Sequence, residues 1–158
     1  MKRVFLIAAT SILILASSCG GDAKKADSTE SAGGSSSAPA TTPSDPNRGI
    51  GKFTTVDLGS TIDRKMVEAG QKIFDVKCSA CHKLTGEKLV GPGWKGVTTR
   101  RAPVWIMNFA TNVDVMLAND PQAQAQLEIC LIRMPNQNLS DDDARHILEF
   151  MRNNDAAK

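Results

Sequence analysis

The sequence predicts an all-α fold, and two observations lead to that prediction. Between residues 59 and 154, apolar side chains recur at intervals of three and four, which is the spacing of helices that bury one face. No stretch of this region alternates apolar and polar residues as a half-buried strand would. We therefore expect a small helical domain over residues 59–154, without a sheet and without internal repeats.

Four helices are expected within this domain. They run over residues 63–81 and 103–110, and the last two begin at Asp120-Pro121 and at Ser140. Asp120 and Ser140 are residues that cap helix starts, and three acidic residues after Ser140 complement the helix dipole. Residues 84–99 and 134–139 are expected to be loops. Gly70 interrupts the apolar stripe of the first helix, so it marks a point of close approach.

The N-terminus has the pattern of an export signal. Lys2 and Arg3 precede the apolar run 4–16, which is too short to span a membrane comfortably, and small residues then lead to Cys19. This pattern resembles the lipobox of bacterial lipoproteins, which implies a signal peptide over residues 1–18 and acylation of Cys19. An ordinary secretory signal with an incidental cysteine is the alternative. In either case the mature chain works outside the cytoplasm.

Residues 19–58 are expected to form a tether behind the acylated Cys19. They are rich in Gly, Ser, Ala, Thr and Pro, so they cannot bury enough apolar surface to offset their chain entropy. We therefore expect a disordered segment up to residue 58, then the folded domain, then a short tail over residues 155–158. Such a domain has a modest core, which a large buried cofactor would enlarge.

The stretch Cys78-Ser79-Ala80-Cys81-His82 contains the clearest chemistry in the chain. Two thiols three residues apart on a helix can both bond to the vinyl edges of one haem, and the adjacent imidazole can then reach the iron. A pair of cysteines can also hold zinc or form a redox disulfide. The zinc alternative would draw its ligands from Cys78, Cys81, Cys130, His82 and His146.

Taken together, these segments resemble a class I cytochrome c domain over residues 61–153. The matching features are the haem motif, Gly70 and Phe74 in the first helix, Gly91-Pro92, Met134-Pro135, and Phe150 in the last helix. The resemblance implies the cytochrome c fold, a small helical domain wrapped around one covalent haem c. It also implies that the first and last helices cross at Gly70, Phe74 and Phe150.

The resemblance implies two axial ligands to the haem iron. His82 would fill one position. Met134 is our choice for the second, because it lies in a loop immediately before Pro135 and the last helix, as the family's ligand does. A thioether ligand stabilises ferrous iron and raises the reduction potential. Met107 and Met116 are rivals, and Met116 is the more serious one because its stretch is expected to be irregular.

Further haem contacts follow from the resemblance. It assigns the backbone carbonyl of Pro92 as the acceptor for the second ring nitrogen of His82. Trp94 would pack on the haem, and Trp105 or Arg101 would hydrogen-bond a propionate. For each of these three side chains, an ordinary core or surface role is an even alternative.

Three more residues have weaker assignments. Asn136 would hold the loop of Met134, with an ordinary surface role as the alternative. His146 falls among polar positions of the last helix and is expected at the surface. Cys130 shares an apolar helical face with Leu127 and Leu131, which favours a buried free thiol over a reactive or paired one.

These features predict a respiratory carrier of single electrons rather than an enzyme. Its donor would be a quinol-oxidising complex and its acceptor a terminal reductase or oxidase. Residues 90–97 and 134–143 look similar to monohaem cytochromes that accompany nitrous-oxide reductase systems, which adds that reductase and denitrification as a specific case. The alternative is a catalytic or gas-sensing haem, for which Met134 must be absent from the iron or displaceable.

Charge and targeting indicate where such a carrier would act. Removal of Lys2 and Arg3 lowers the formal net charge from +2 to zero, so nothing indicates nucleic-acid binding. Basic residues outnumber acidic ones over residues 64–101, which would steer an acidic partner or simply be a solvated face. The anchor places the chain in a bacterial cell envelope, facing the periplasm. Gly20 favours the outer membrane, although sorting rules differ between bacteria and the inner membrane stays open.

Overall fold

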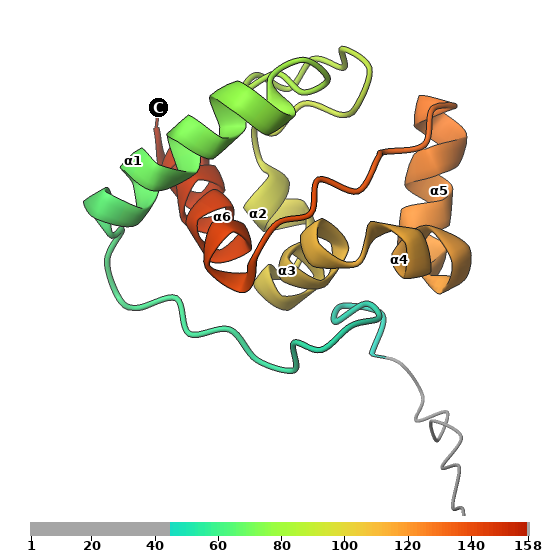
Figure 1. The fold of residues 1–158 in the computed structure, drawn as a ribbon, viewed down its shortest axis with the longest axis horizontal. Helices are drawn as coiled ribbons and strands as arrows, with labels where there is room; N and C mark the ends of the chain where they lie inside the picture. The colour runs from blue at the N-terminus through green and yellow to red at the C-terminus, as the bar shows by residue number, and fades with distance from the viewer. Residues whose placement is uncertain (1–44, 158) are drawn as a thin grey trace, which may run out of the picture. The chain divides into compact units, whose positions relative to one another are not determined.

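The computed structural model describes residues 45–157, and Figure 1 shows how they are arranged. The elements in chain order are α1 (Arg64–Ile73), the π-helical turn η1 (Phe74–Cys78), α2 (Val97–Arg100), α3 (Pro103–Thr111), α4 (Val113–Asn119), α5 (Pro121–Cys130) and α6 (Asp141–Ala156). Within these residues the only strand-like pairing is an isolated bridge between His82 and Lys88. The prediction of an all-α fold is therefore confirmed.

Helices α1 and α6 cross each other and make the most extensive contact between two helices of the described chain (Figure 1). Gly70 lies at the crossing, where an added Cβ would overlap the His146 carbonyl oxygen and lie 2.8 Å from the Phe150 Cβ. The rings of Phe74 and Phe150 pack with their centroids 5.6 Å apart. The crossing expected at Gly70, Phe74 and Phe150 is confirmed.

The first helix differs in its second half from the expected α-helix over residues 63–81. It begins as expected, because the Asp63 side chain accepts hydrogen bonds from the N–H groups of Lys65 and Met66. After Ile73, however, the backbone widens into η1, in which the Ser79 N–H donates to the Phe74 carbonyl five residues back. Apolar spacing does not distinguish a single π-turn from an α-turn.

Two short helices replace stretches that were expected to be irregular. One is α2, which begins within the predicted loop 84–99 and ends just beyond it, and the other is α4, which contains Met116. The Met116 side chain is fully buried, and its sulfur accepts a hydrogen bond from the Ile50 N–H at 2.9 Å. At the start of neither helix does the residue at the N-cap position, Gly96 or Asn112, accept a side-chain hydrogen bond from the helix.

The last two helices begin where the sequence predicted. The Asp120 carboxylate accepts from the Ala123 N–H at the start of α5. At the start of α6, the Ser140 hydroxyl accepts from the Asp143 N–H, and the Asp143 carboxylate accepts from the Ser140 N–H, which completes a capping box. Helix α6 continues to Ala156, so the expected domain boundary at residue 154 is corrected.

Residues 45–58, which we call the strap, pack along the domain and correct the expectation of a tether up to residue 58 (blue-green in Figure 1). The fully buried Asn108 holds the strap. Its amide group donates to the carbonyls of Arg48 and Phe53, and its oxygen accepts from the Phe53 N–H, all at 3.0 Å. Four strap side chains contact the core: Ile50, Phe53, Val56 and Leu58. Because these side chains are irregularly spaced in a polar stretch, no apolar periodicity identifies them as core residues.

The remainder of the N-terminal expectations lies outside the described residues. This applies to the signal peptide over residues 1–18, to Cys19 and to the tether up to residue 44. From residue 45 to residue 157, no helix combines the length and the apolar character needed to cross a membrane.

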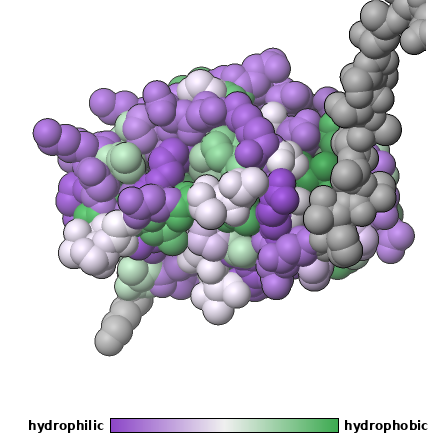
Figure 2. Space-filling view, turned by 90° about the horizontal axis from the view of Figure 1, so that it is seen from below, coloured by the Kyte–Doolittle hydropathy of each residue, from purple (hydrophilic) through white to green (hydrophobic). Residues whose placement is uncertain are grey.

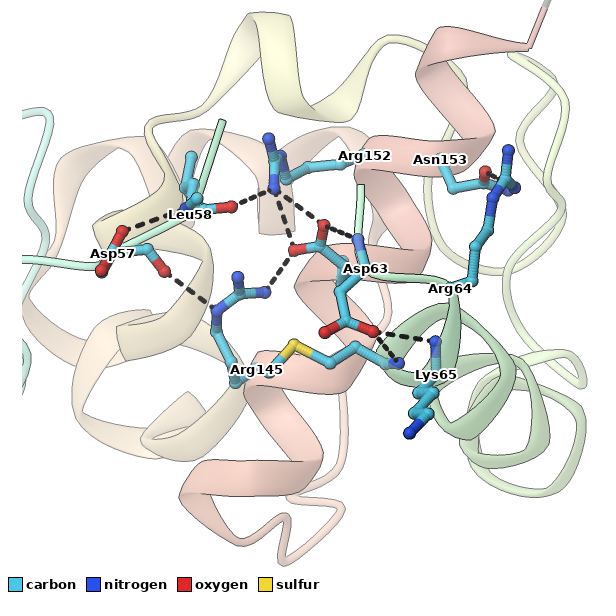
Figure 3. Close-up of polar contacts among 11 residues, drawn as sticks. Asp57, Leu58, Asp63, Arg64, Lys65, Arg145, Arg152 and Asn153 are labelled. Carbon is cyan, nitrogen blue, oxygen red and sulfur yellow. Dashed lines mark hydrogen bonds and ion pairs between the residues drawn. The ribbon is translucent and has the colours of Figure 1, made fainter. Parts of the chain in front are cut away.

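A buried carboxylate joins α6 to the start of α1 and to the strap. Glu149 has no exposed side-chain area, and it accepts from the guanidinium groups of Arg145 and Arg152 and from the Asp63 N–H. Arg152 also donates to the Leu58 carbonyl at 2.7 Å. Figure 3 shows Arg145 and Arg152 on α6 together with Asp63 and Leu58. Because all its partners are present, the buried charge is compensated.

Polar side chains buried in the core are few, and they are hydrogen-bonded. They are Asn108, Asp120 and Glu149. No buried side-chain nitrogen or oxygen in the described chain lacks a partner. The face in Figure 2 is mainly hydrophilic, with small separate hydrophobic areas. The buried apolar side chains form one core cluster, and part of this cluster borders the cavity described next.

Candidate functional site

A cavity of about 250 Å³ lies among η1, residues 81–97, α3, α5, α6 and the loop 131–139. Most of its lining is apolar. The polar and sulfur-containing groups in the lining include the thiols of Cys78 and Cys81, the imidazole of His82 and the thioether of Met134. The fold therefore brings the predicted haem motif and the predicted second ligand to one cavity.

Both cysteines of the motif are free thiols. Cys78 ends η1 and is buried, and Cys81 follows in the next turn and is half-buried. Burial raises the pKa of Cys78 to about 11, although the nearby positive charge of Lys77 acts in the opposite direction. Before haem attachment the thiol is thus protonated at neutral pH.

His82 is held in the form that a metal ligand requires. Its Nδ1 lies 2.9 Å from the Pro92 carbonyl, where the resemblance assigned it. A carbonyl only accepts, so Nδ1 bears the proton and the lone pair of Nε2 is available. Burial lowers the pKa of His82 below its ordinary value of 6.5, although the bond to Pro92 opposes that shift. The neutral imidazole is therefore favoured.

Met134 reaches the cavity from the loop 131–139. Of the three methionines considered as second ligand, it alone lines the cavity, whereas Met107 and Met116 are buried elsewhere in the core. Two contacts hold the loop: Lys77 donates to the Gln137 carbonyl at 2.9 Å, and Arg133 pairs with Asp114 at 2.8 Å. Side-chain contacts thus position a loop that has no regular secondary structure.

Comparison with known proteins identifies the family. The family model for cytochrome c matches residues 67–155, which is more than half of the chain. This chain belongs to the cytochrome c family. No curated protein matches it.

Solved cytochromes support the same assignment. Cytochrome c from Rhodothermus marinus is 34% identical, with a TM-score of 0.66, and the match covers 68% of this chain and 92% of that one. An engineered cytochrome c from the same organism, Rma TDE, also matches at 34% identity with a TM-score of 0.66, over 70% of this chain and 98% of that one. A structure of the engineered protein bound to a carbene intermediate matches at 34% identity with a TM-score of 0.64. The class I cytochrome c fold expected from the sequence is thus confirmed.

The cofactor of this cytochrome is a covalently attached haem c, as in its family, and the residues of the cavity fit that group. Two free thiols, Cys78 and Cys81, stand at the spacing that covalent attachment needs. Apolar walls suit a porphyrin, and His82 offers an unprotonated Nε2. The interior space that the helices enclose is thus a place for haem rather than a packing defect.

The zinc hypothesis is not supported for this cytochrome. In the part of the chain that the structure describes, no three or more His, Cys, Asp or Glu side chains are grouped to hold a metal ion. Cys130 is buried in α5, and His146 lies half-buried on α6, where its carbonyl packs against Gly70. These two residues therefore do not complete a site with Cys78 and Cys81.

Trp94 links the haem-binding side of the cytochrome to its helix crossing. It is buried and lines the cavity, as expected for a haem contact. Its ring centroid lies 5.6 Å from that of His82 and 4.8 Å from that of Phe74. A third contact, to Phe150 at 6.5 Å, extends the aromatic group to α6.

Trp105 does not have the free donor that was expected for a propionate. Its Nε1–H donates to the buried carboxylate of Asp120 at 3.1 Å, which corrects that assignment. Arg101 stacks over the Trp105 ring at 4.9 Å and lines the cavity, so it stays available as an expected partner of a propionate. Arg100, which the sequence did not single out, also lines the cavity and donates to the Gly93 carbonyl.

Asn136 supports its own loop rather than the cavity. It does not line the cavity, and its side-chain oxygen accepts from the Asn138 N–H at 2.8 Å. Its expected role of holding the Met134 loop is thus limited to this local turn.

Cys130 is a buried free thiol, as expected, but the structure also places it in the cavity wall beside Gln126. Leu131 does not share its face. It follows the end of α5 in a left-handed conformation, with φ of 61°, and is 83% exposed.

Sequence analysis missed most of the apolar wall. The missed lining residues are Val97, Ile106, Leu117, Ala123, Ile132, Leu139, Ile147 and Met151. Several of them belong to helical apolar stripes, so the available signal identified them as core residues without showing that they face a cofactor.

Proposed function

We propose that this cytochrome is a lipid-tethered carrier of single electrons that faces the periplasm and uses His82 and Met134 as axial ligands of its haem. One observation supports this proposal above the others: two distant loops bring an imidazole with a free Nε2 and a thioether to the same cavity. Carriers with both axial positions filled leave no open position for oxygen or peroxide chemistry.

Each residue of the site has a distinct task in this proposal. Cys78 and Cys81 would hold the haem covalently, and the Pro92 carbonyl orients the His82 ring and leaves its Nε2 free to bind iron. Met134 provides a soft ligand that favours the ferrous form. The bound haem supplies a one-electron change of its iron. The apolar walls exclude water, and no side chain has to gain or lose a proton.

The tether and the partners are part of the same proposal. Acylation of Cys19 would keep the domain at a membrane of the bacterial envelope. The donor would be a quinol-oxidising complex, and the acceptor a terminal reductase or oxidase such as nitrous-oxide reductase. Lys77, Lys83 and Lys88 lie on the segment that contains the haem motif, so an acidic partner would approach this side faster at low salt.

A catalytic or gas-sensing haem is the second candidate. It is favoured by the loop of Met134, because no backbone-to-backbone hydrogen bond holds residues 132–139 among the described residues. A relative with 34% identity is described as bound to a carbene intermediate after engineering. This function requires Met134 to leave the iron.

The axial ligands are tested with visible spectra of the haem-loaded chain, oxidised and reduced, for the native protein and for Met134→Ala. We expect sharp reduced bands and a weak long-wavelength oxidised band, which Met134→Ala abolishes. Met66→Ala is the control, because Met66 is a half-buried methionine outside the cavity, and it should keep the band. A band that survives Met134→Ala contradicts the assignment. A native protein that binds an external ligand readily supports the second candidate.

The anchor is tested separately. Replacement of Cys19 by Ala should release the haem-containing chain from the membrane fraction, with unchanged spectra. Retention of the Cys19→Ala chain in the membrane would exclude acylation at this position as the anchor.

A further inference from the structure

The short helix α2 receives its N-terminal cap from another helix. Gly96, with φ of 76°, precedes it and has no side chain to accept from the first N–H groups. The Asp155 carboxylate from the last turn of α6 takes that place. It accepts from the Gly96 N–H at 2.5 Å, from the Thr98 N–H at 2.8 Å and from the Thr98 hydroxyl at 2.6 Å. Asp155 is thus the cap of α2, fifty-nine residues beyond Gly96.

The end of α6 is capped in return by a residue next to α2. The last turn of α6 contains no basic residue of its own. The ammonium group of Lys95 donates to the carbonyls of Asn154 and Ala157, where a positive charge complements the helix dipole. We call the pair Lys95 and Asp155 the clamp. Two helix ends therefore stabilise each other through opposite charges.

The clamp is continuous with the segment that holds His82. Pro92, whose carbonyl accepts from His82 Nδ1, is only three residues before Lys95. The Trp94 N–H donates to the Lys83 carbonyl at 2.9 Å, which fixes the segment next to His82. Beside the clamp, the Asn154 amide donates to the Leu84 carbonyl at 2.9 Å. Helix α6 is thus tied to both sides of the His82 loop.

We propose that Asp155 and Lys95 are positioning residues for His82: the clamp holds the Pro92 segment on α6 and so keeps the Pro92 carbonyl on Nδ1. The inference rests on the proposed role of His82 as axial ligand. A hydrogen bond at Nδ1 makes the imidazole a stronger donor through Nε2, which stabilises ferric iron and lowers the reduction potential. A loosened clamp weakens this bond and raises the potential.

Two variants separate positioning from simple electrostatics. Asp155→Asn removes a negative charge, and Lys95→Met removes a positive one. If these charges act only through space, the two variants shift the potential in opposite directions. If the clamp positions Pro92, both variants raise it. In both variants the Nδ1 proton of His82 should also exchange with solvent about tenfold faster, because weakening the clamp by about 1.4 kcal/mol makes local opening ten times more frequent.

The measurements are the midpoint potential and the proton NMR signal of His82 in the reduced, haem-loaded chain. Asp141→Asn is the matched control. The substitution removes a charge from the other end of α6. In the native chain, Asp141 forms an exposed ion pair with Lys52. The substitution should leave the exchange rate of the His82 proton unchanged.

Opposite shifts of the potential, or an unchanged exchange rate in both clamp variants, would overturn the positioning role while leaving His82 as a ligand. A native protein without the low-spin spectrum of a six-coordinate haem would instead overturn the proposed ligation, and the inference with it. If Asp155→Asn does not fold, Lys95→Met alone still decides, because its electrostatic and positioning effects have opposite signs.

Discussion

His82 lies so close to Gly91 that this position leaves no room for a side chain. An added Cβ would lie 2.9 Å from Nδ1 and 3.0 Å from Nε2, and would overlap the ring carbon between them. The Gly91 N–H also donates to the Cys81 carbonyl at 2.9 Å, so the backbone cannot retreat without breaking a contact to the haem motif. The glycine is therefore required by the imidazole.

Gly91→Ala should displace the His82 ring and destabilise the folded chain by about 1–3 kcal/mol, as overpacking of a dense interior usually does. Thermal unfolding and the visible spectrum of the haem-loaded chain measure the two effects. Gly86→Ala is the matched control in the same region, because no atom lies within 4 Å of a Cβ at Gly86. Equal stability of the two variants would contradict this account.

The role of a single residue was predictable where its chemical type and its spacing in the sequence are enough to define that role. The pair Cys78 and Cys81 with His82 forms a motif, and the structure places Met134 at the same cavity. The role of Trp105 was not predictable, because its N–H is taken by Asp120, and the sequence does not show that these two side chains meet. Whether the Trp105 N–H donates to Asp120 or to a haem propionate depends on which groups the fold brings together.

At the scale of elements, the contact between α1 and α6 depends on the absence of a side chain at Gly70. The backbone of α6 occupies the space where a Cβ would lie, and backbone cannot move aside as a flexible side chain can. On an exposed helix, by contrast, Ala is preferred over Gly by about 1 kcal/mol. The sign of the change in unfolding free energy caused by Gly70→Ala therefore shows how tightly the two helices pack at their crossing.

We expect Gly70→Ala to lower the free energy of unfolding by about 1–3 kcal/mol despite the better helix propensity of Ala. Denaturant unfolding of the haem-loaded chain measures this loss. Gln71→Ala, at an exposed neighbouring position of α1, should change it by less than about 0.5 kcal/mol. A gain in stability from Gly70→Ala would show that the two helices can separate without cost.

Elements with their own start signals were predictable, and elements that depend on distant partners were not. Asp120 and Ser140 marked α5 and α6 correctly. Helix α2 escaped detection because its cap is Asp155, far along the chain, and α4 because its buried Met116 meets the strap. The strap itself escaped because its stability comes from Asn108 in α3 rather than from local pattern.

At the scale of the whole molecule, Glu149 connects parts of the chain that are far apart in sequence. Burial alone would raise its pKa, but hydrogen bonds from Arg145, from the Asp63 N–H and from Arg152 outweigh burial and hold the pKa below its ordinary value of 4.5. A carboxylate with a lowered pKa stabilises the folded state above its unfolded pKa. This stabilisation is lost as the pH falls through the folded pKa.

Glu149→Gln should therefore destabilise the chain at pH 7 by about 3 kcal/mol, because it leaves two half-buried guanidinium groups without their anion. The difference from the native protein should shrink as the pH falls below 4.5 and the native carboxylate becomes protonated. Denaturant unfolding at several pH values measures both effects. Glu68→Gln, at an exposed position of α1, is the control. A difference that is independent of pH would contradict the role of the charge.

The way in which the strap is fastened has a mechanical consequence. A pulling force applied at its N-terminal end would first load the hydrogen bond from the Gln122 amide to the Pro46 carbonyl. It would then load the hydrogen bonds of Asn108 and the bond between the Ile50 N–H and the Met116 sulfur. Gln122, Asn108 and Met116 belong to α5, α3 and α4, and none of them lines the cavity. Tension from an anchor would therefore peel the strap before it reached α1 and the haem motif behind it. The strap contacts would thus bear the tension, so that the helices around the haem motif keep their positions.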